Sequence, residues 1–193
     1  EPVPGPAARR FWLGRMGRIA EPFLAAEADR AEAGEPRAIE DKGSATLLSG
    51  RFTLTARADR IDLMRDGRIH VYDYKSGEPP SAEQQKYFEK QLILECAIAE
   101  AGGFSIPGAA EAAAHSYIHL GGAGKTEENT LEPGDTARAW EDLERLIASY
   151  MDPSRGYVSR RAVFQERFPG DYDHLARYGE WATSDAPCPE DME

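Results

Sequence analysis

The sequence predicts an α/β domain in which a small mixed β-sheet is flanked by helices. The first observation is a long segment with apolar residues at helical spacing, and the second is a set of short apolar strands separated by a glycine turn. A chain of 193 residues that is 41% hydrophobic can bury one core. We therefore expect a single domain over residues 1–181, with a helical part over 1–36, a sheet-and-helix core over 37–181 and an acidic tail over 182–193.

The first helix is expected over residues 9–33. Its apolar residues recur at nearly helical spacing, and Gly34 and Pro36 end the pattern. We interpret it as a helix that packs on the core through Phe11, Leu13, Met16, Ile19, Phe23 and Leu24.

Residues 45–75 are expected to form two or three antiparallel strands, and a glycine turn sets their register. A two-residue turn at Asp66 and Gly67 would place Asp59 opposite Tyr74, on the wrong face. A three-residue turn that ends with Gly67 at positive φ pairs apolar with apolar residues and sets Asp59 opposite Asp73. We favour the three-residue turn.

This register brings charged side chains together. Asp73 and Lys75 share one face of their strand, and opposed Asp59 and Asp73 have Cβ atoms roughly 4.5–5.5 Å apart. Like charges this close repel unless a cation lies between them, and carboxylate oxygens favour Mg²⁺ or Mn²⁺. The alternative is a set of surface ion pairs of little weight. Because residues 69–74 are apolar on both faces, we expect a buried strand and favour the metal site.

The next helix is expected from Ser81 to about Ala101, with Gln84 completing a capping box. Gln84, Gln91 and Glu95 then share a face beside the two strands. This face is either solvated or turned toward a substrate.

Residues 115–120 are expected to form another strand, whose His115 and His119 we interpret as structural because they are too far apart on a strand to share a metal. The glycine-rich residues 121–126 are interpreted as a flexible loop, since His119 stands where a phosphate loop needs glycine. A final helix is expected from about Asp135, with Trp140, Leu143, Ile147 and Tyr150 as its apolar stripe.

Three linked motifs carry a family resemblance: FTLTARADRID at 52–62, VYDYKSG at 71–77 and QL at 91–92. Together they resemble the PD-(D/E)xK nuclease domain of the RecB and AddB type, in particular the C-terminal nuclease region of an AddB-type helicase-nuclease subunit from double-strand break repair. Residues 172–181 also resemble that subfamily, so the likeness covers about residues 40–181. It implies a restriction-endonuclease-like core.

The resemblance also implies roles for individual residues. Asp59, Asp73 and the backbone carbonyl of Tyr74 would bind Mg²⁺ or Mn²⁺, Lys75 would orient the attacking water, and Gln91 matches the glutamine of the family's helix motif. The implied function is a metal-dependent DNA nuclease, of exonuclease type, in double-strand break repair and recombination. The implied partners are single-stranded or unwound DNA, an AddA-type subunit and an upstream part of the parent chain.

The chain departs from the family pattern at Ala56 and Glu95, which replace a glycine and a tyrosine, and no histidine precedes Asp59. The resemblance also implies a histidine or glutamate on an upstream helix that completes the metal site. Here this ligand would be one of the carboxylates Glu21, Glu27 and Glu40, or a histidine expected before residue 1. Two other functions stay open. One is an inactive nuclease-like structural or DNA-path domain, and the other is a stand-alone RecB-like exonuclease.

Charge and cysteine content limit these possibilities. A net charge of −11 predicts weak DNA affinity, because phosphate contacts supply most nonspecific binding. Cys96 and Cys188 are interpreted as reduced thiols, and two cysteines cannot hold an iron-sulfur cluster. With no signal peptide and no long apolar run, we expect a cytoplasmic protein that does not enter a membrane.

Overall fold

The structure is a computed structural model that describes residues 5–106, 111–121, 126–155, 174–177, 179–182, 184 and 185. Its contacts divide the chain into two compact units, Glu1–Glu141 and Asp142–Glu193. The first unit contains the sheet and all the residues discussed below as a site. The domain boundaries expected from the sequence stay a prediction.

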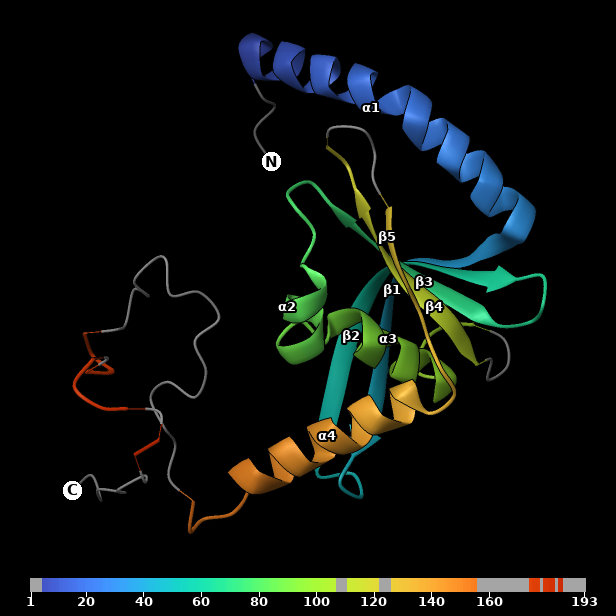
Figure 1. Cartoon of the computed structure of the whole chain (residues 1–193). Helices are drawn as coiled ribbons and strands as arrows, with labels where there is room; N and C mark the ends of the chain where they lie inside the picture. The colour runs from blue at the N-terminus through green and yellow to red at the C-terminus, as the bar shows by residue number, and fades with distance from the viewer. Residues whose placement is uncertain are drawn as a thin grey trace. The chain divides into compact units, whose positions relative to one another are not determined.

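The first unit is built on a five-stranded sheet with the order β1-β2-β3-β4-β5 (Figure 1). The strands are β1 (Gly34–Leu47), β2 (Phe52–Met64), β3 (Ile69–Lys75), β4 (Ala112–His119) and β5 (Thr126–Thr130). Only β3 and β4 run parallel, and the other neighbours are antiparallel. The sheet is therefore mixed and flanked by helices, which confirms the predicted restriction-endonuclease-like α/β fold.

The turn between β2 and β3 is the predicted three-residue turn. Gly67 has φ of +86°, and the amide of Met64 donates to the carbonyl of Arg68 at 2.8 Å. Leu63 lies opposite Ile69 and Arg60 opposite Tyr72. The same register, continued by one residue, sets Asp59 opposite Asp73. All residues from Ile69 to Asp73 are buried, as expected for a strand that is apolar on both faces.

Helix α1 (Pro6–Ala33) forms where it was expected, but its predicted packing role is wrong for most of its apolar side chains. Among the described residues of α1 only Ile19 is buried, while Leu13, Met16 and Leu24 are exposed. The reason is that only part of α1 lies against the sheet, where Phe23 meets Tyr74 with ring centroids 6.3 Å apart. Strand β1 follows directly at Gly34, about ten residues before the first expected strand.

The helix expected from Ser81 to Ala101 is two helices, α2 (Ala82–Tyr87) and α3 (Gln91–Glu100). The predicted capping box is confirmed, because Ser81 and Gln84 bond each other's backbone amides. Gln84 is used in this cap and therefore does not share a face with Gln91. The break between the helices has a packing reason. Helix α2 has no buried residue, whereas α3 buries Leu92, Cys96 and Ile98.

The core of the first unit lies between α3 and the sheet, and Figure 1 shows α2 and α3 over the same face. Its buried members come from α3, from four strands and from the segment after α3: Ala38, Ala58, Ile61, Ile69, Val71, Leu92, Cys96, Ile98, Ala99, Phe104, Ala112 and Tyr117. Strand β1 crosses Phe104 at Gly43, where a Cβ atom would lie 2.5 Å from the ring. Glycine is therefore required there by close packing.

The last described elements agree in part with the sequence. Strand β4 covers residues 115–119 of the expected strand and begins three residues earlier, and α4 (Asp135–Tyr150) begins at the predicted residue. Strand β5 was not predicted, because its sequence TEENT contains no apolar residue. The expected loop at residues 121–126 falls mainly on residues 122–125, outside the described residues. None of the described helices has the length and apolar character needed to cross a membrane.

Candidate active site

The carboxyl end of β3 carries the first two predicted site residues. Asp73 is only 5% exposed, and its Oδ2 lies 2.8 Å from the ammonium nitrogen of Lys75. The side chain of Lys75 is 35% exposed, and its Nζ lies 5.6 Å from the centroid of the Tyr117 ring on β4. A buried carboxylate thus sits beside a lysine that is accessible to solvent.

Asp59 joins the site from β2. Its Oδ2 accepts a hydrogen bond from the backbone amide of Tyr74 at 2.9 Å. The backbone pairing of β2 with β3 ends at Arg60 and Tyr72, so the side chain of Asp59 takes over where the ladder stops. Asp59 is therefore held beside Tyr74, which lies between Asp73 and Lys75 in the sequence.

Helix α3 closes the site with Gln91. The amide nitrogen of Gln91 donates to Asp73 Oδ1 at 3.2 Å and to Glu95 Oε1 at 3.0 Å. This single side chain ties the beginning of α3 to the end of β3. The structure thus brings together the predicted residues Asp59, Asp73, Lys75 and Gln91.

Glu95 is part of the same cluster, although the sequence analysis assigned it no role in metal binding or catalysis. It is 3% exposed, and burial raises its pKa from the ordinary 4.5 to about 7. The charges of Asp73 and Asp59 act in the same direction, against the hydrogen bond from Gln91 and the charge of Lys75. The sequence signal was the spacing of Gln91 and Glu95, since residues four apart share a helix face.

The cluster fits a divalent cation. Among the described residues, Glu95 Oε2 is a buried oxygen without a hydrogen-bond donor, and the buried Asp73 Oδ2 is met by the ammonium of Lys75 at 2.8 Å. Such oxygens are costly to bury, and they are the ligands that Mg²⁺ and Mn²⁺ prefer. No three His, Cys, Asp or Glu side chains in the described part of the chain are grouped closely enough to hold a metal. The fit therefore rests on Asp59, Asp73 and a backbone oxygen, which suits Mg²⁺ because it keeps several waters.

The upstream carboxylates are engaged elsewhere or lie at the surface. Glu27 accepts from Arg60 at 2.6 Å and from Arg30 at 2.9 Å, and Glu40 pairs with Arg57 at 2.9 Å. Glu21 is exposed on α1.

Arg60 organises the opposite face of the same two strands. Its guanidinium donates twice to Asp62, with both N···O distances 2.6 Å, and once to the Tyr74 hydroxyl at 3.3 Å. Tyr74 is therefore held on both faces, through its hydroxyl by Arg60 and through its amide by Asp59. The sequence pattern did not predict this role of Arg60.

Two of the described histidines, His70 and His115, are buried, and His119 lies opposite Lys75 in the register of β3 and β4. His70 contacts Ser116 with Nε2 and Oγ 2.8 Å apart. Cys96 is a buried thiol of the core, whereas Cys188 lies outside the described residues. Residues 172, 173 and 178 of the predicted motif near the end of the chain also lie outside them.

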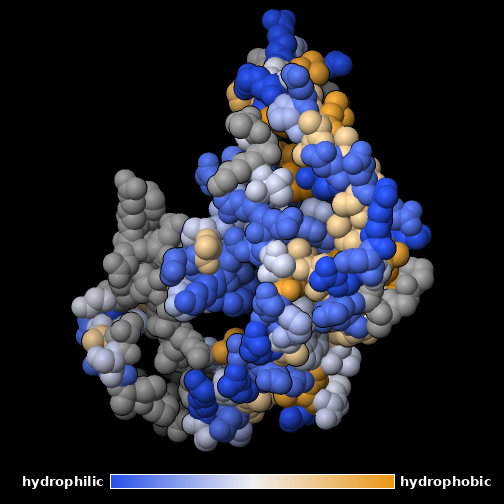
Figure 2. Space-filling model, turned by 45° about the vertical axis from the view of Figure 1, so that its right-hand side comes forward, coloured by the Kyte–Doolittle hydropathy of each residue, from blue (hydrophilic) through white to orange (hydrophobic). Residues whose placement is uncertain are grey.

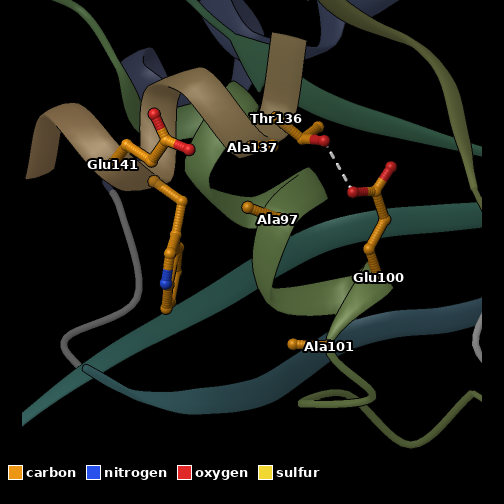
Figure 3. A pocket seen from close by; sticks show the side chains of 7 residues that line it. Ala97, Glu100, Ala101, Thr136, Ala137 and Glu141 are labelled. Atoms are coloured by element: carbon orange, nitrogen blue, oxygen red, sulfur yellow. Dashed lines mark hydrogen bonds between the residues drawn. The ribbon is translucent and has the colours of Figure 1, made fainter. Parts of the chain in front are cut away.

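A separate hollow of about 290 Å³ lies between α3 and the start of α4 (Figure 3). Thr136 Oγ1 donates to Glu100 Oε2 at 2.6 Å across its rim. None of the site residues lines it; its walls are Ala97, Glu100, Ala101, Thr136, Ala137, Trp140 and Glu141. The hollow is therefore distinct from the carboxylate cluster.

A family model of the PD-(D/E)XK nuclease superfamily matches residues 1–178. The chain belongs to this superfamily. It is also 26% identical over 118 residues to the uncharacterized protein RT0391 of Rickettsia typhi. That match covers 58% of this chain but 14% of the relative, so the chain corresponds to a small part of a much longer protein. Members of the superfamily are typically nucleases, and generally use Mg²⁺ or Mn²⁺, which agrees with the donor set of the cluster.

Proposed function

We propose that this chain is a metal-dependent DNA nuclease that hydrolyses phosphodiester bonds in the manner of an exonuclease. The observation that carries the proposal is the buried carboxylate of Asp73 between Lys75 and Gln91, beside a second buried carboxyl, Glu95, whose Oε2 has no hydrogen-bond donor. A purely structural carboxylate at this depth is expected to have its oxygens satisfied.

In this proposal Asp59, Asp73 and the backbone carbonyl of Tyr74 hold the cation. When bound, Mg²⁺ or Mn²⁺ supplies Lewis acidity and lowers the pKa of water so that hydroxide is available near neutral pH. The bond from the Tyr74 amide fixes Asp59, and the bond from Gln91 fixes Asp73. Both carboxylates are therefore positioned before the cation arrives.

Lys75 has a different task. Its ammonium group lies beside Asp73 and remains accessible, so it can contact a phosphate oxygen or the attacking water. A fixed positive charge there stabilises the negative charge that develops on phosphorus oxygens as the water attacks. The chain needs no nucleophilic side chain for this reaction.

The larger assignment is to an AddB-type helicase-nuclease that acts in double-strand break repair together with an AddA-type subunit. It is supported by the likeness of residues 52–62, 71–77 and 91–92 to that subfamily. The match to only 14% of a longer relative is compatible with a module inside a larger protein. In this setting the parent protein delivers single-stranded or unwound DNA to a module whose own net charge is −11.

The test is degradation of end-labelled linear single-stranded DNA in Mg²⁺ or Mn²⁺. We expect Asp73→Asn and Lys75→Ala each to lower the rate at least about 100-fold, since each removes charge from the reacting centre. Asp66→Asn and Lys42→Ala are matched controls, because both residues are exposed and lie outside the cluster. The assay is run on the chain alone and with an AddA-type subunit. Cleavage that survives both site variants would overturn the assignment and favour the inactive structural domain.

A further inference from the structure

The two halves of α1 have opposite charge. Residues 6–20 contain four arginines and no acidic residue, whereas residues 21–33 contain four acidic residues and one arginine. The whole chain has a net charge of −11. The first half, residues 6–20, is called here the arginine-rich half of α1, and it is a cationic segment on an acidic protein.

Aromatic and basic side chains are both exposed on this segment. Phe11 is 62% exposed and Trp12 46%, and their rings meet edge to face with centroids 5.9 Å apart. Arg9, Arg10 and Arg18 are exposed as well. Figure 2 shows hydrophobic and hydrophilic side chains side by side in the upper part of the molecule, which α1 forms.

The arginine-rich half lies next to the candidate active site. Arg15 Nη2 donates to the carbonyl of Ser76, the residue that follows Lys75, at 2.5 Å. The same guanidinium lies 5.4 Å from the ring centroid of Trp12. Trp12, Arg15 and Ile19 fall on one stripe of the helix, and Ile19 is buried. Trp12 is therefore on the side of α1 that faces the protein, about one turn before Arg15, which contacts Ser76.

We propose that the arginine-rich half of α1 is a binding surface for single-stranded nucleic acid that leads the strand toward Asp73 and Lys75. The proposal rests on the proposed nuclease function and adds where the substrate binds. Surfaces of this kind combine arginines that contact the phosphate backbone with aromatic side chains on which bases stack. The arginines supply the first element and Trp12 the second, and the contact of Arg15 with Ser76 connects both to the site.

An anionic lipid surface is the other partner that a basic helix with exposed aromatic residues could bind. The position of the segment favours nucleic acid, because it adjoins carboxylates and a lysine suited to phosphodiester chemistry. We therefore treat lipid binding as an outcome of the test.

The experiment measures binding of a fluorescent single-stranded oligonucleotide by anisotropy, with EDTA present and Asp73→Asn in every protein. The test variant is Arg9→Glu with Arg18→Glu, and the matched control is Arg51→Glu with Arg65→Glu, two exposed arginines at the hairpin turns. We expect the test variant to weaken binding about tenfold or more and to reduce the salt slope by about two, one for each phosphate contact. Trp12→Ala is expected to weaken binding about fivefold or more through lost stacking. Circular dichroism verifies that helix content is unchanged.

Equal affinity of the test and control variants would overturn the proposal. The proposal would also be overturned if the test variant bound anionic vesicles more weakly but bound the oligonucleotide as well as the control does. Cleavage is measured separately with Asp73 intact. If cleavage depends on Asp73 while binding ignores the arginine-rich half, the surface is wrong and the nuclease function stands. If binding depends on that half and cleavage is absent, the surface stands and the nuclease function fails.

Discussion

The two faces of the hairpin formed by β2 and β3 contact carboxylates in opposite electrostatic conditions. On the α1 face, Glu27 and Asp62 both accept hydrogen bonds from Arg60. On the α3 face, Asp73 and Glu95 share the neutral amide of Gln91; Lys75 lies beside Asp73, and Glu95 keeps an oxygen without a donor. Burial alone would raise the pKa of Glu27, but hydrogen bonds from Arg60 and Arg30 outweigh it and lower that pKa, while the pKa of Glu95 is raised to about 7.

The two faces therefore differ in how their carboxylates are balanced by positive charge. On the α1 face the guanidinium of Arg60 is matched by two carboxylates, Glu27 and Asp62. The α3 face is short of positive charge, and Lys75 is its nearest cation at 2.8 Å from Asp73. A shortage of this kind is unfavourable for the protein alone and favourable for a protein that binds a cation.

Removing Arg60 should destabilise the α1 face of the hairpin more than any other change considered. We expect Arg60→Met to lower the free energy of unfolding by about 3–5 kcal/mol, because it leaves the buried Asp62 without its partner and Glu27 with Arg30 alone. Arg57→Met is the matched control, since Arg57 is exposed and pairs only with the exposed Glu40; it should cost less than about 1 kcal/mol. Urea unfolding of the metal-free protein measures both. Equal losses in the two variants would show that the α1 face is not a compensated cluster.

The stability contributions of Glu95 and Glu27 should change in opposite directions with pH. Glu95 is neutral in both states below pH 4.5, and above about pH 7 the folded state holds its charge in a buried position. The unfolding free energy of the metal-free protein should therefore fall as pH rises from 4.5 to 7, by at most about 3 kcal/mol from this residue. Glu27 has the opposite sign, because its stabilising pair is present above its ordinary pKa of 4.5 and is lost as pH falls through its lowered pKa.

Glu95→Gln should flatten the loss between pH 4.5 and 7, and Glu27→Gln should leave that window unchanged and flatten the acid limb below it. Chemical unfolding in EDTA at a series of pH values gives both curves. Parallel curves for the wild type and Glu95→Gln would contradict the assignment of a buried, uncompensated charge to Glu95.

The sequence predicted those features that short-range patterns determine. The register of β2 and β3 followed from matching apolar residues across a turn with Gly67 at positive φ, and this register set Asp59 beside Asp73. The capping box at Ser81 is equally local. Asp73 and Lys75 were placed together because residues two apart share one face of a strand.

Features that depend on distant contacts were missed. The break between α2 and α3 arises because α3 lies on the sheet and α2 does not, and no breaking residue marks it. The pairing of Glu27 with Arg60 joins residues 33 positions apart, and β5 exists only because β4 offers it an edge. Glu95 looked like one of several polar residues on a helix, and only its burial by the sheet distinguishes it.

The smallest effect tests whether the two faces communicate. Tyr74 touches both, with its hydroxyl 3.3 Å from Arg60 and its amide on Asp59. Tyr74→Phe removes the hydroxyl and keeps the amide, so we expect a loss of about 0.5–1.5 kcal/mol in stability, as for one hydrogen bond. Mn²⁺ affinity, measured by electron paramagnetic resonance, should change less than about twofold, which corresponds to about 0.4 kcal/mol. A tenfold loss of Mn²⁺ affinity would show instead that the Arg60 cluster positions Asp59, because the cluster reaches that carboxylate through Tyr74.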